Sequence, residues 1–202
     1  GGPPRGPCVR GVPLPDPRGA CPTGGGRCPW AVWSCRVRRG GWHGSGVGPE
    51  RRRGDVIVAV DGTPALRAQP SGTEVYARQV IQALAIAREG RQLRVYANGG
   101  SRPAWLDPQV DWRGIPFPRL WTHWRFRQAL HADPPDVVFV PSHVLPIGLR
   151  IPGVVTIHDV GHRRERASYS PRSWWYLELM TRSMARRARR LIAVSRSTAD
   201  DL

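Results

Sequence analysis

The sequence of 202 residues contains no lysine, and it has no apolar run of the ~20 residues that a membrane-spanning helix needs. All 31 basic residues are therefore arginine, and they outnumber the 15 acidic residues to give a net charge of +16. Arginine codons are rich in G and C and lysine codons are not, so we infer a GC-rich coding sequence, as in many bacteria. Because part of the charge then reflects codon usage, we expect no nucleic-acid partner.

Cysteine is confined to the first part of the chain, at Cys8, Cys21, Cys28 and Cys35. The gaps of 12, 6 and 6 residues between them do not match the closely spaced cysteine pairs of zinc sites. Nothing in the sequence resembles the apolar h-region of a signal peptide. A disulfide framework is possible, but we expect unstructured thiols, no metal, no cofactor and a cytoplasmic protein.

Residues 1–54 differ in composition from the rest of the chain. They hold 14 glycines, 9 prolines and ten arginines against two acidic residues, so they have little apolar surface to offset backbone entropy. We predict a disordered segment here, followed by an ordered domain over 55–202. The chain begins with glycine and its first methionine is Met180, which leads us to expect a fragment or a translation through an upstream region. Val56, read from a GUG codon, would then be the native start, and 1–54 would not be native coding sequence.

The ordered domain alternates apolar strands with amphipathic helices. The predicted strands are 55–62, 92–99, 136–141, 153–159 and 191–195; the predicted helices are 71–90, 119–132 and 170–190, with another capped by Ser197. The strands are almost wholly apolar, as expected where helices cover both faces of a sheet. This alternation predicts an α/β fold, a Rossmann-like doubly wound parallel sheet with flanking helices.

Two helices carry clear boundary signals. Ser71 and Glu74 fit a capping box, and Gly90 fits a C-terminal stop. Ser170 and Pro171 fit an N-cap and a first helical residue. The first helix is predicted to bury one stripe of side chains, namely Tyr76, Val80, Ala83, Leu84 and Ala87.

Polar residues follow three of the predicted strands at their carboxyl ends, where open α/β sheets bind ligands. They are Asp61-Gly62 with the helix start Ser71-Gly72-Thr73, then Ser142 and His143, then His158 and Asp159. On a doubly wound topology these three sets converge on one rim of the sheet. The sequence therefore predicts a substrate site along this rim.

The residue types at the rim suggest individual roles. Gly72 and Thr73 offer backbone N–H groups at a helix N-terminus, a natural seat for a phosphate, although a simple tight turn would also explain the glycine. There is no G-x-G-x-x-G and no P-loop motif. His158 can contact substrate or hydrogen-bond a neighbouring backbone group. Asp159 can hold its imidazole or cap the turn.

Arginines at 182, 186 and 190 recur at helical spacing on the last long helix. They form either a solvated face or a contact with an anionic membrane surface or an acceptor phosphate. Trp174 and Trp175 near the start of the same helix are interpreted as core residues rather than as an interfacial anchor.

Four blocks of the domain, in this order, resemble the N-terminal domain of family 4 glycosyltransferases, which have the GT-B fold. They are VIVAVDGTPAL with SGTEVYARQVIQALA, PDVVFVPSHVLPI, GVVTIHDV, and YSPRSWWYLELMTRSMARRARRLIAVSRSTADDL. The most specific part combines the strand ending in His-Asp, the arginine-rich helix opened by proline and the segment IAVSRSTADDL. The resemblance covers residues 55–202 and does not extend to 1–54.

The resemblance implies a retaining transferase that moves a sugar from a nucleotide-sugar donor to an acceptor held by the N-terminal domain. It implies that His158 lies at the reacting sugar and that Gly72 and Thr73 approach the donor phosphate. No metal is implied, because helix N-termini and basic side chains can stabilise the leaving diphosphate. Many relatives have a glycine pair where this chain has Ser71-Gly72. The family's nucleotide site and paired glutamates belong to a second Rossmann-like domain that the sequence does not include, so we expect this chain to be inactive alone.

Three other interpretations fit parts of the sequence. The arginine excess fits a basic α/β module that binds nucleic acid or a membrane surface. A doubly wound sheet also fits a dehydrogenase, but the glycine fingerprint of that class is missing. The third interpretation is an inactive product of a truncated gene.

Overall fold

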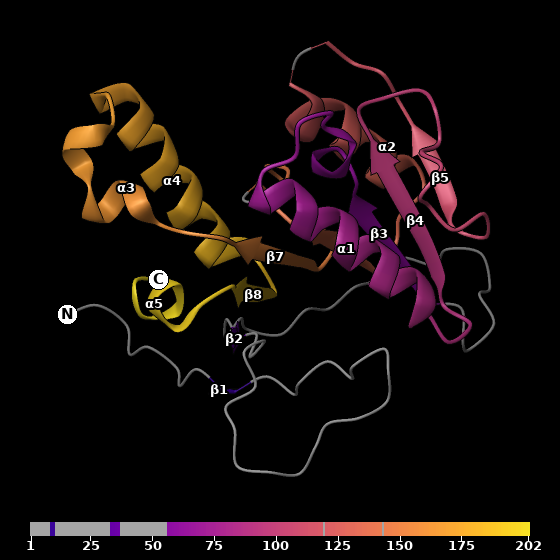
Figure 1. The fold of residues 1–202 in the computed structure, drawn as a ribbon, viewed down its shortest axis with the longest axis horizontal. Helices are drawn as coiled ribbons and strands as arrows, with labels where there is room; N and C mark the ends of the chain where they lie inside the picture. Colours follow the sequence, from indigo (N-terminus) through magenta and orange to yellow (C-terminus); the bar gives the residue numbers. More distant parts are fainter. Residues whose placement is uncertain (1–8, 11–32, 37–55, 119, 143) are drawn as a thin grey trace.

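The computed structural model describes residues 9–10, 33–36, 56–118, 120–142 and 144–202 (Figure 1). At its centre six parallel strands are arranged in the order β5-β4-β3-β6-β7-β8. Their bounds are β3 (Ile57–Asp61), β4 (Gln92–Ala97), β5 (Asp111–Gly114), β6 (Val137–Val140), β7 (Gly153–Ile157) and β8 (Arg190–Ala193). Counted along the chain, this is the 3-2-1-4-5-6 order of the Rossmann fold. The predicted fold class is confirmed.

Two short strands lie at the β8 edge of this sheet. β1 (Val9–Arg10) pairs with β2 (Trp33–Arg36), and β2 pairs antiparallel with β8. Both lie in the segment that the sequence predicts to be disordered. The other residues of 1–55 are outside the described part of the chain, Cys8, Cys21 and Cys28 among them, so the prediction of disorder there stays a prediction.

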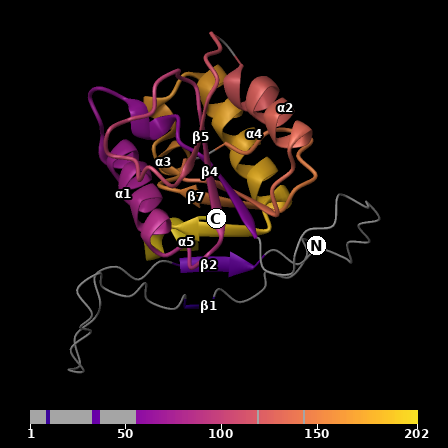
Figure 2. The ribbon, with the colours of Figure 1, turned by 90° about the vertical axis from the view of Figure 1, so that its right-hand side faces the viewer.

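Helices cover both faces of the parallel strands. Their bounds are α1 (Gly72–Ile86), α2 (Arg127–Ala132), α3 (Gly161–Arg164), α4 (Pro171–Arg187) and α5 (Arg196–Asp200), with 3-10 turns η1 (Pro64–Leu66) and η3 (Arg166–Ser168) and a π-helical segment η2 (Trp121–Phe126). Figure 2 shows α1 on one side of the strands and α2 and α4 on the other. This is the arrangement expected of right-handed crossovers in a doubly wound sheet.

The two cores follow from the alternation of side chains along each strand. In β3, Ala59 packs in one cluster with Phe126 and Met184 from the α2 and α4 side. Its neighbour Val60 packs in the other cluster with Ile81 of α1. The strands therefore bury both of their faces, which explains their almost continuous apolar sequence.

α1 begins as predicted but buries a different stripe. Ser71 N–H donates to Glu74 Oε2 over 2.9 Å, as the capping box requires. The buried residues are Glu74, Ala77, Ile81 and Ala85, whereas Ala83 and Ala87 of the predicted stripe are exposed. The small side chains of Ala77 and Ala85 bring the helix close to the sheet, and the larger residues Val80 and Leu84 of the predicted stripe pack at the border of this contact. The helix also ends at Ile86, before the turn in which Gly90 has a φ of +82°.

Further elements and boundaries differ from the sequence predictions; the strand predicted over 153–159, for example, ends at Ile157 as β7. β5 was not predicted, because its four residues, Asp-Trp-Arg-Gly, form a half-exposed edge strand without an apolar run. α4 is capped by Ser170 with Pro171 first, as predicted, but it ends at Arg187. α5 is capped by Ser195, whose hydroxyl accepts Thr198 N–H over 3.0 Å, and not by Ser197.

Candidate functional site

The predicted rim coincides with the point where the strand order reverses. β3 and β6 are neighbours in the sheet, but their chain connections lead away in opposite directions. Ligands of doubly wound folds bind in the crevice beyond the carboxyl ends at such a point. Asp61 ends β3, Ser142 follows β6 closely, and His158 follows β7, so the topology brings the three predicted sets to one edge.

His158 is held by contacts from two other elements. Its Nε2–H donates to the carbonyl oxygen of Pro141, which follows β6, over 2.9 Å. A carbonyl oxygen only accepts, so this contact places a proton on Nε2. The edge of the imidazole also meets the Tyr76 ring, with 5.0 Å between centroids and planes at 86°. The backbone-bonded alternative for His158 is thus present, and it orients the ring beside α1.

Tyr76 is a residue of this site that the sequence interpretation assigned to the core. Its hydroxyl lies 3.1 Å from Thr156 Oγ1. This contact joins α1 to β7 two residues before His158. Burial raises the pKa of the Tyr76 phenol, whose hydroxyl is protonated at neutral pH even at its ordinary pKa. The sequence did contain a signal for this role, because Tyr76 lies in the second turn of the helix that begins at the rim.

Gly72 and Thr73 occupy the first two positions of α1, where backbone N–H groups have no acceptor within the helix. A Cβ at Gly72 would meet nothing within 4 Å, and Gly72 is not among the residues with positive φ. The backbone and the packing therefore do not require glycine, which argues against the tight-turn explanation. The absence of a side chain leaves open space at the helix N-terminus.

A carboxylate already lies in this helix turn. Glu74 is buried, and its hydrogen bonds from the Ser71 hydroxyl and N–H lower its pKa. Arg67 Nη1 lies 3.4 Å from Glu74 Oε1 and offsets part of the charge. An anion at Gly72 and Thr73 would thus share the positive end of α1 with Glu74.

The remaining predicted site residues are placed less centrally. Asp159 is exposed, and its Oδ1 accepts Gly161 N–H over 3.0 Å, which is the turn-capping alternative. Ser142 is half-buried, and its carbonyl oxygen accepts Val144 N–H over 2.8 Å. His143 lies outside the described residues, so its predicted role stays a prediction.

Asp61 is the most buried ionisable group at the rim, with 4% of its surface exposed. Burial raises its pKa, and hydrogen bonding from Thr63, whose N–H lies 3.0 Å from Oδ1, opposes this only in part. The sequence analysis placed Asp61 at the rim without giving it a role. The position of Asp61 at the end of a predicted strand does not show how deeply its side chain is buried.

The predicted arginine row does not form one helix face. Arg182 and Arg186 are exposed on α4, but Arg190 is the half-buried first residue of β8 and pairs with Val154. The helix ends at Arg187, so helical spacing does not continue to 190. Arg182 also donates from Nε to Glu178 Oε1 over 2.6 Å. The expected three-arginine surface is therefore wrong at Arg190.

The described part of the chain has neither a cluster of metal ligands nor a helix that could span a membrane. No three His, Cys, Asp or Glu side chains there are grouped closely enough to hold a metal ion. Within the same residues, no helix combines the length and apolarity needed to cross a membrane. The prediction that no metal takes part in the chemistry stays a prediction.

The strand order defines a Rossmann-like α/β domain, and the candidate site lies at the carboxyl ends of its strands. The model of Glycosyltransferase Family 4 matches residues 70–202, more than half of the chain, and includes α1, His158 and α4. The chain belongs to this family. No curated protein and no solved structure gives a significant match.

Proposed function

We propose that this chain is the acceptor-side domain of a retaining glycosyltransferase, which transfers a sugar from a nucleotide-sugar to an acceptor. The observation that carries the proposal is the position of His158. It directly follows the buried parallel strand β7, faces the second turn of α1 and is oriented by Pro141 at the point where the strand order reverses. Family membership supplies the reaction class.

In the proposed reaction His158 contacts the reacting sugar. The anomeric carbon exchanges its bond to the donor diphosphate for a bond to the acceptor oxygen on the same face, and the acceptor proton leaves with the diphosphate. The N–H groups of Gly72 and Thr73 approach that diphosphate, since a helix N-terminus favours negative charge. In this proposal Ser142 and Asp159 contact the substrate beside them, and the role of His143, which is outside the described residues, stays a prediction.

The nucleotide-sugar is a co-substrate, and the proposal requires neither a metal nor a bound cofactor. Within the family resemblance, the nucleotide is read by a second Rossmann-like domain. We further propose a cytoplasmic protein that touches the inner face of a membrane, with Arg182 and Arg186 of α4 near the lipid phosphates.

The test is a screen of nucleotide-sugars with the product of the complete gene. Release of nucleotide diphosphate would identify the donor, and NMR of the product would give the anomeric configuration. Retention of the donor configuration supports the proposal. Inversion, or no turnover with any nucleotide-sugar and acceptor extract, contradicts it.

A further inference from the structure

One face of α4 exposes large apolar side chains to solvent. Trp175 is 62% exposed, Tyr176 53% and Leu179 62%. The opposite face of the helix is buried, as shown by Met180 and Met184. The α4 surface, defined as Trp175, Tyr176 and Leu179 with their exposed arginine neighbours, therefore has no partner within the described residues that covers it.

The two tryptophans near the start of α4 divide between the two faces. Trp174 is half-buried, and its Nε1–H donates to the carbonyl oxygen of His162 over 2.7 Å. The Arg166 guanidinium lies over the same ring at 4.5 Å from the centroid. The interpretation of both tryptophans as core residues is wrong for Trp175, which is exposed, and Trp174 is half-buried at the border of the fold and is not part of either core cluster.

The charged residues around the apolar centre of the α4 surface are all positive. Arg172, Arg182 and Arg186 are exposed on the same helix. Glu178 is the one carboxylate within α4, and it is buried. Arg163 and Arg182 bind it, at 2.8 Å and 2.6 Å. The exposed side of α4 thus presents positive charge and apolar surface without negative charge.

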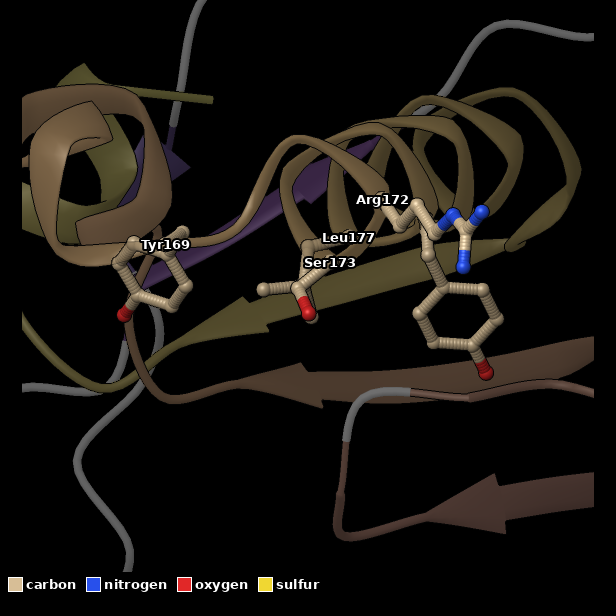
Figure 3. Close-up of a pocket in the computed structure, with 5 residues that line it drawn as sticks. Tyr169, Arg172, Ser173 and Leu177 are labelled. Carbon is tan, nitrogen blue, oxygen red and sulfur yellow. The ribbon is translucent and has the colours of Figure 1, made fainter.

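A shallow cleft of about 520 Å³ adjoins this surface. Its lining includes Tyr169, Arg172, Ser173, Tyr176 and Leu177. Figure 3 shows Ser173 and Leu177 between Tyr169 and Arg172. A guanidinium with hydroxyl groups suits a phosphate group, which accepts charge-assisted hydrogen bonds. Tyr169 also packs edge-on to His162, at 6.5 Å between centroids, so the cleft borders the segment that follows His158.

We propose that the α4 surface docks on a lipid bilayer that carries anionic headgroups. Trp175, Tyr176 and Leu179 enter the interfacial layer, and the cleft around Arg172 takes a headgroup phosphate. Aromatic and leucine side chains bordered by arginine are the features of helices that lie in a membrane interface. A second copy of this chain is a poorer occupant, because its charge of +16 would repel an arginine-lined face.

This inference rests on the membrane contact proposed above and not on sugar transfer, so the two can fail separately. It differs from that contact in that the apolar side chains of Trp175, Tyr176 and Leu179, and not the arginines alone, meet the membrane. Binding is measured without donor or acceptor, by sedimentation of the full chain with phosphatidylcholine vesicles that contain or lack phosphatidylglycerol. Physiological salt is used, because residues 1–54 carry ten arginines that would bind anionic vesicles at low salt.

The variant Trp175→Ser/Leu179→Ser should partition into anionic vesicles at least about tenfold more weakly, because it loses apolar burial. Ile86→Ser is the matched control, since Ile86 is 80% exposed on α1 across the sheet, and it should bind like the wild type. Arg172→Gln should weaken binding more than Arg91→Gln. Arg91 is 48% exposed in its side chain and lies after α1.

A second readout tests insertion directly. Lipids brominated on their acyl chains should quench tryptophan fluorescence of the wild type, and Trp175→Phe should remove most of this quenching while keeping the fold. The proposal is overturned if the double variant binds as tightly as the wild type or if Trp175→Phe leaves the quenching unchanged. It is also overturned if the wild type does not bind anionic vesicles, in which case another protein segment covers this face.

Discussion

His158 Nε2–H donates to the carbonyl oxygen of Pro141 over 2.9 Å, so the imidazole after β7 is oriented by the residue after β6. In the neutral ring this leaves the lone pair on Nδ1. Thr198 Oγ1 donates to the His158 carbonyl oxygen over 3.2 Å, which ties the same residue to α5. The ring therefore has a defined direction at the rim without needing a carboxylate to select its tautomer.

Gly72→Ala separates a ligand role from a folding role. The free energy of unfolding should change by no more than about 0.5 kcal/mol, because a Cβ at Gly72 meets nothing within 4 Å. The KM for the nucleotide-sugar should rise about tenfold, since the methyl group would crowd a diphosphate at the helix N-terminus. Steady-state kinetics on the complete gene product measure this. Gly100→Ala is the control, because its Cβ also meets nothing; equal KM values for both variants would count against the phosphate role.

Asp61→Asn should stabilise the fold above pH 4. Burial raises the pKa of Asp61 in the folded state, so its stabilising contribution is complete below the unfolded pKa and is lost as pH rises through the folded pKa. Asparagine does not titrate, and the gain at pH 7 should be on the order of 1–3 kcal/mol. Urea unfolding at pH 4 and pH 7 tests this. A difference between wild type and variant that does not grow with pH would refute the argument.

Glu178→Gln should behave in the opposite way. Hydrogen bonds from Arg163, and from Arg182 and His162, lower the pKa of Glu178 to about 2. This contribution is complete above the unfolded pKa and is lost as pH falls through about 2. The variant should be destabilised at pH 7 by on the order of 3 kcal/mol.

The measurement for Glu178→Gln is thermal unfolding across the acidic range. The difference from wild type should close between about pH 4.5 and pH 2. Glu89→Gln is the control, because Glu89 is 77% exposed in its side chain and should change little. A gap that is the same at pH 7 and pH 3 would show that the buried ion pairs are not its cause.

Strand and helix alternation predicted the parallel sheet because that signal is carried by long apolar runs. β5 was missed because it is an edge strand that depends on charged side chains, with Arg94 Nε 3.5 Å and Arg113 Nη2 2.8 Å from Asp111 Oδ2. Arg94 comes from the neighbouring strand β4, and the local Asp111–Arg113 pair is polar, so no apolar pattern marks β5. The buried stripe of α1 was also predicted wrongly. The small side chains of Ala77 and Ala85 are the buried ones, because they let the helix approach the sheet closely.

The position of a candidate residue at the rim could be predicted from where a strand ends, whereas its burial and its contacts could not. His158 lies at the rim because its strand ends there, and the sequence was enough to place it. The pKa of Asp61, the contact of Tyr76 with His158 and the outward direction of Trp175 depend on packing between elements. Arg190 was misplaced because helical spacing was extended past the true end of α4 at Arg187.

The most direct test of the central claim is sugar transfer by the complete gene product with His158→Ala beside the wild type. The account predicts turnover below about one hundredth of wild type with the fold intact and the melting temperature lowered by only a few degrees, because the imidazole acts on substrate and its hydrogen bond to Pro141 contributes about 1 kcal/mol. His131→Ala, at an exposed position of α2, should retain full turnover. Near-normal turnover by His158→Ala would contradict the account and leave His158 as a residue that only bonds the Pro141 backbone.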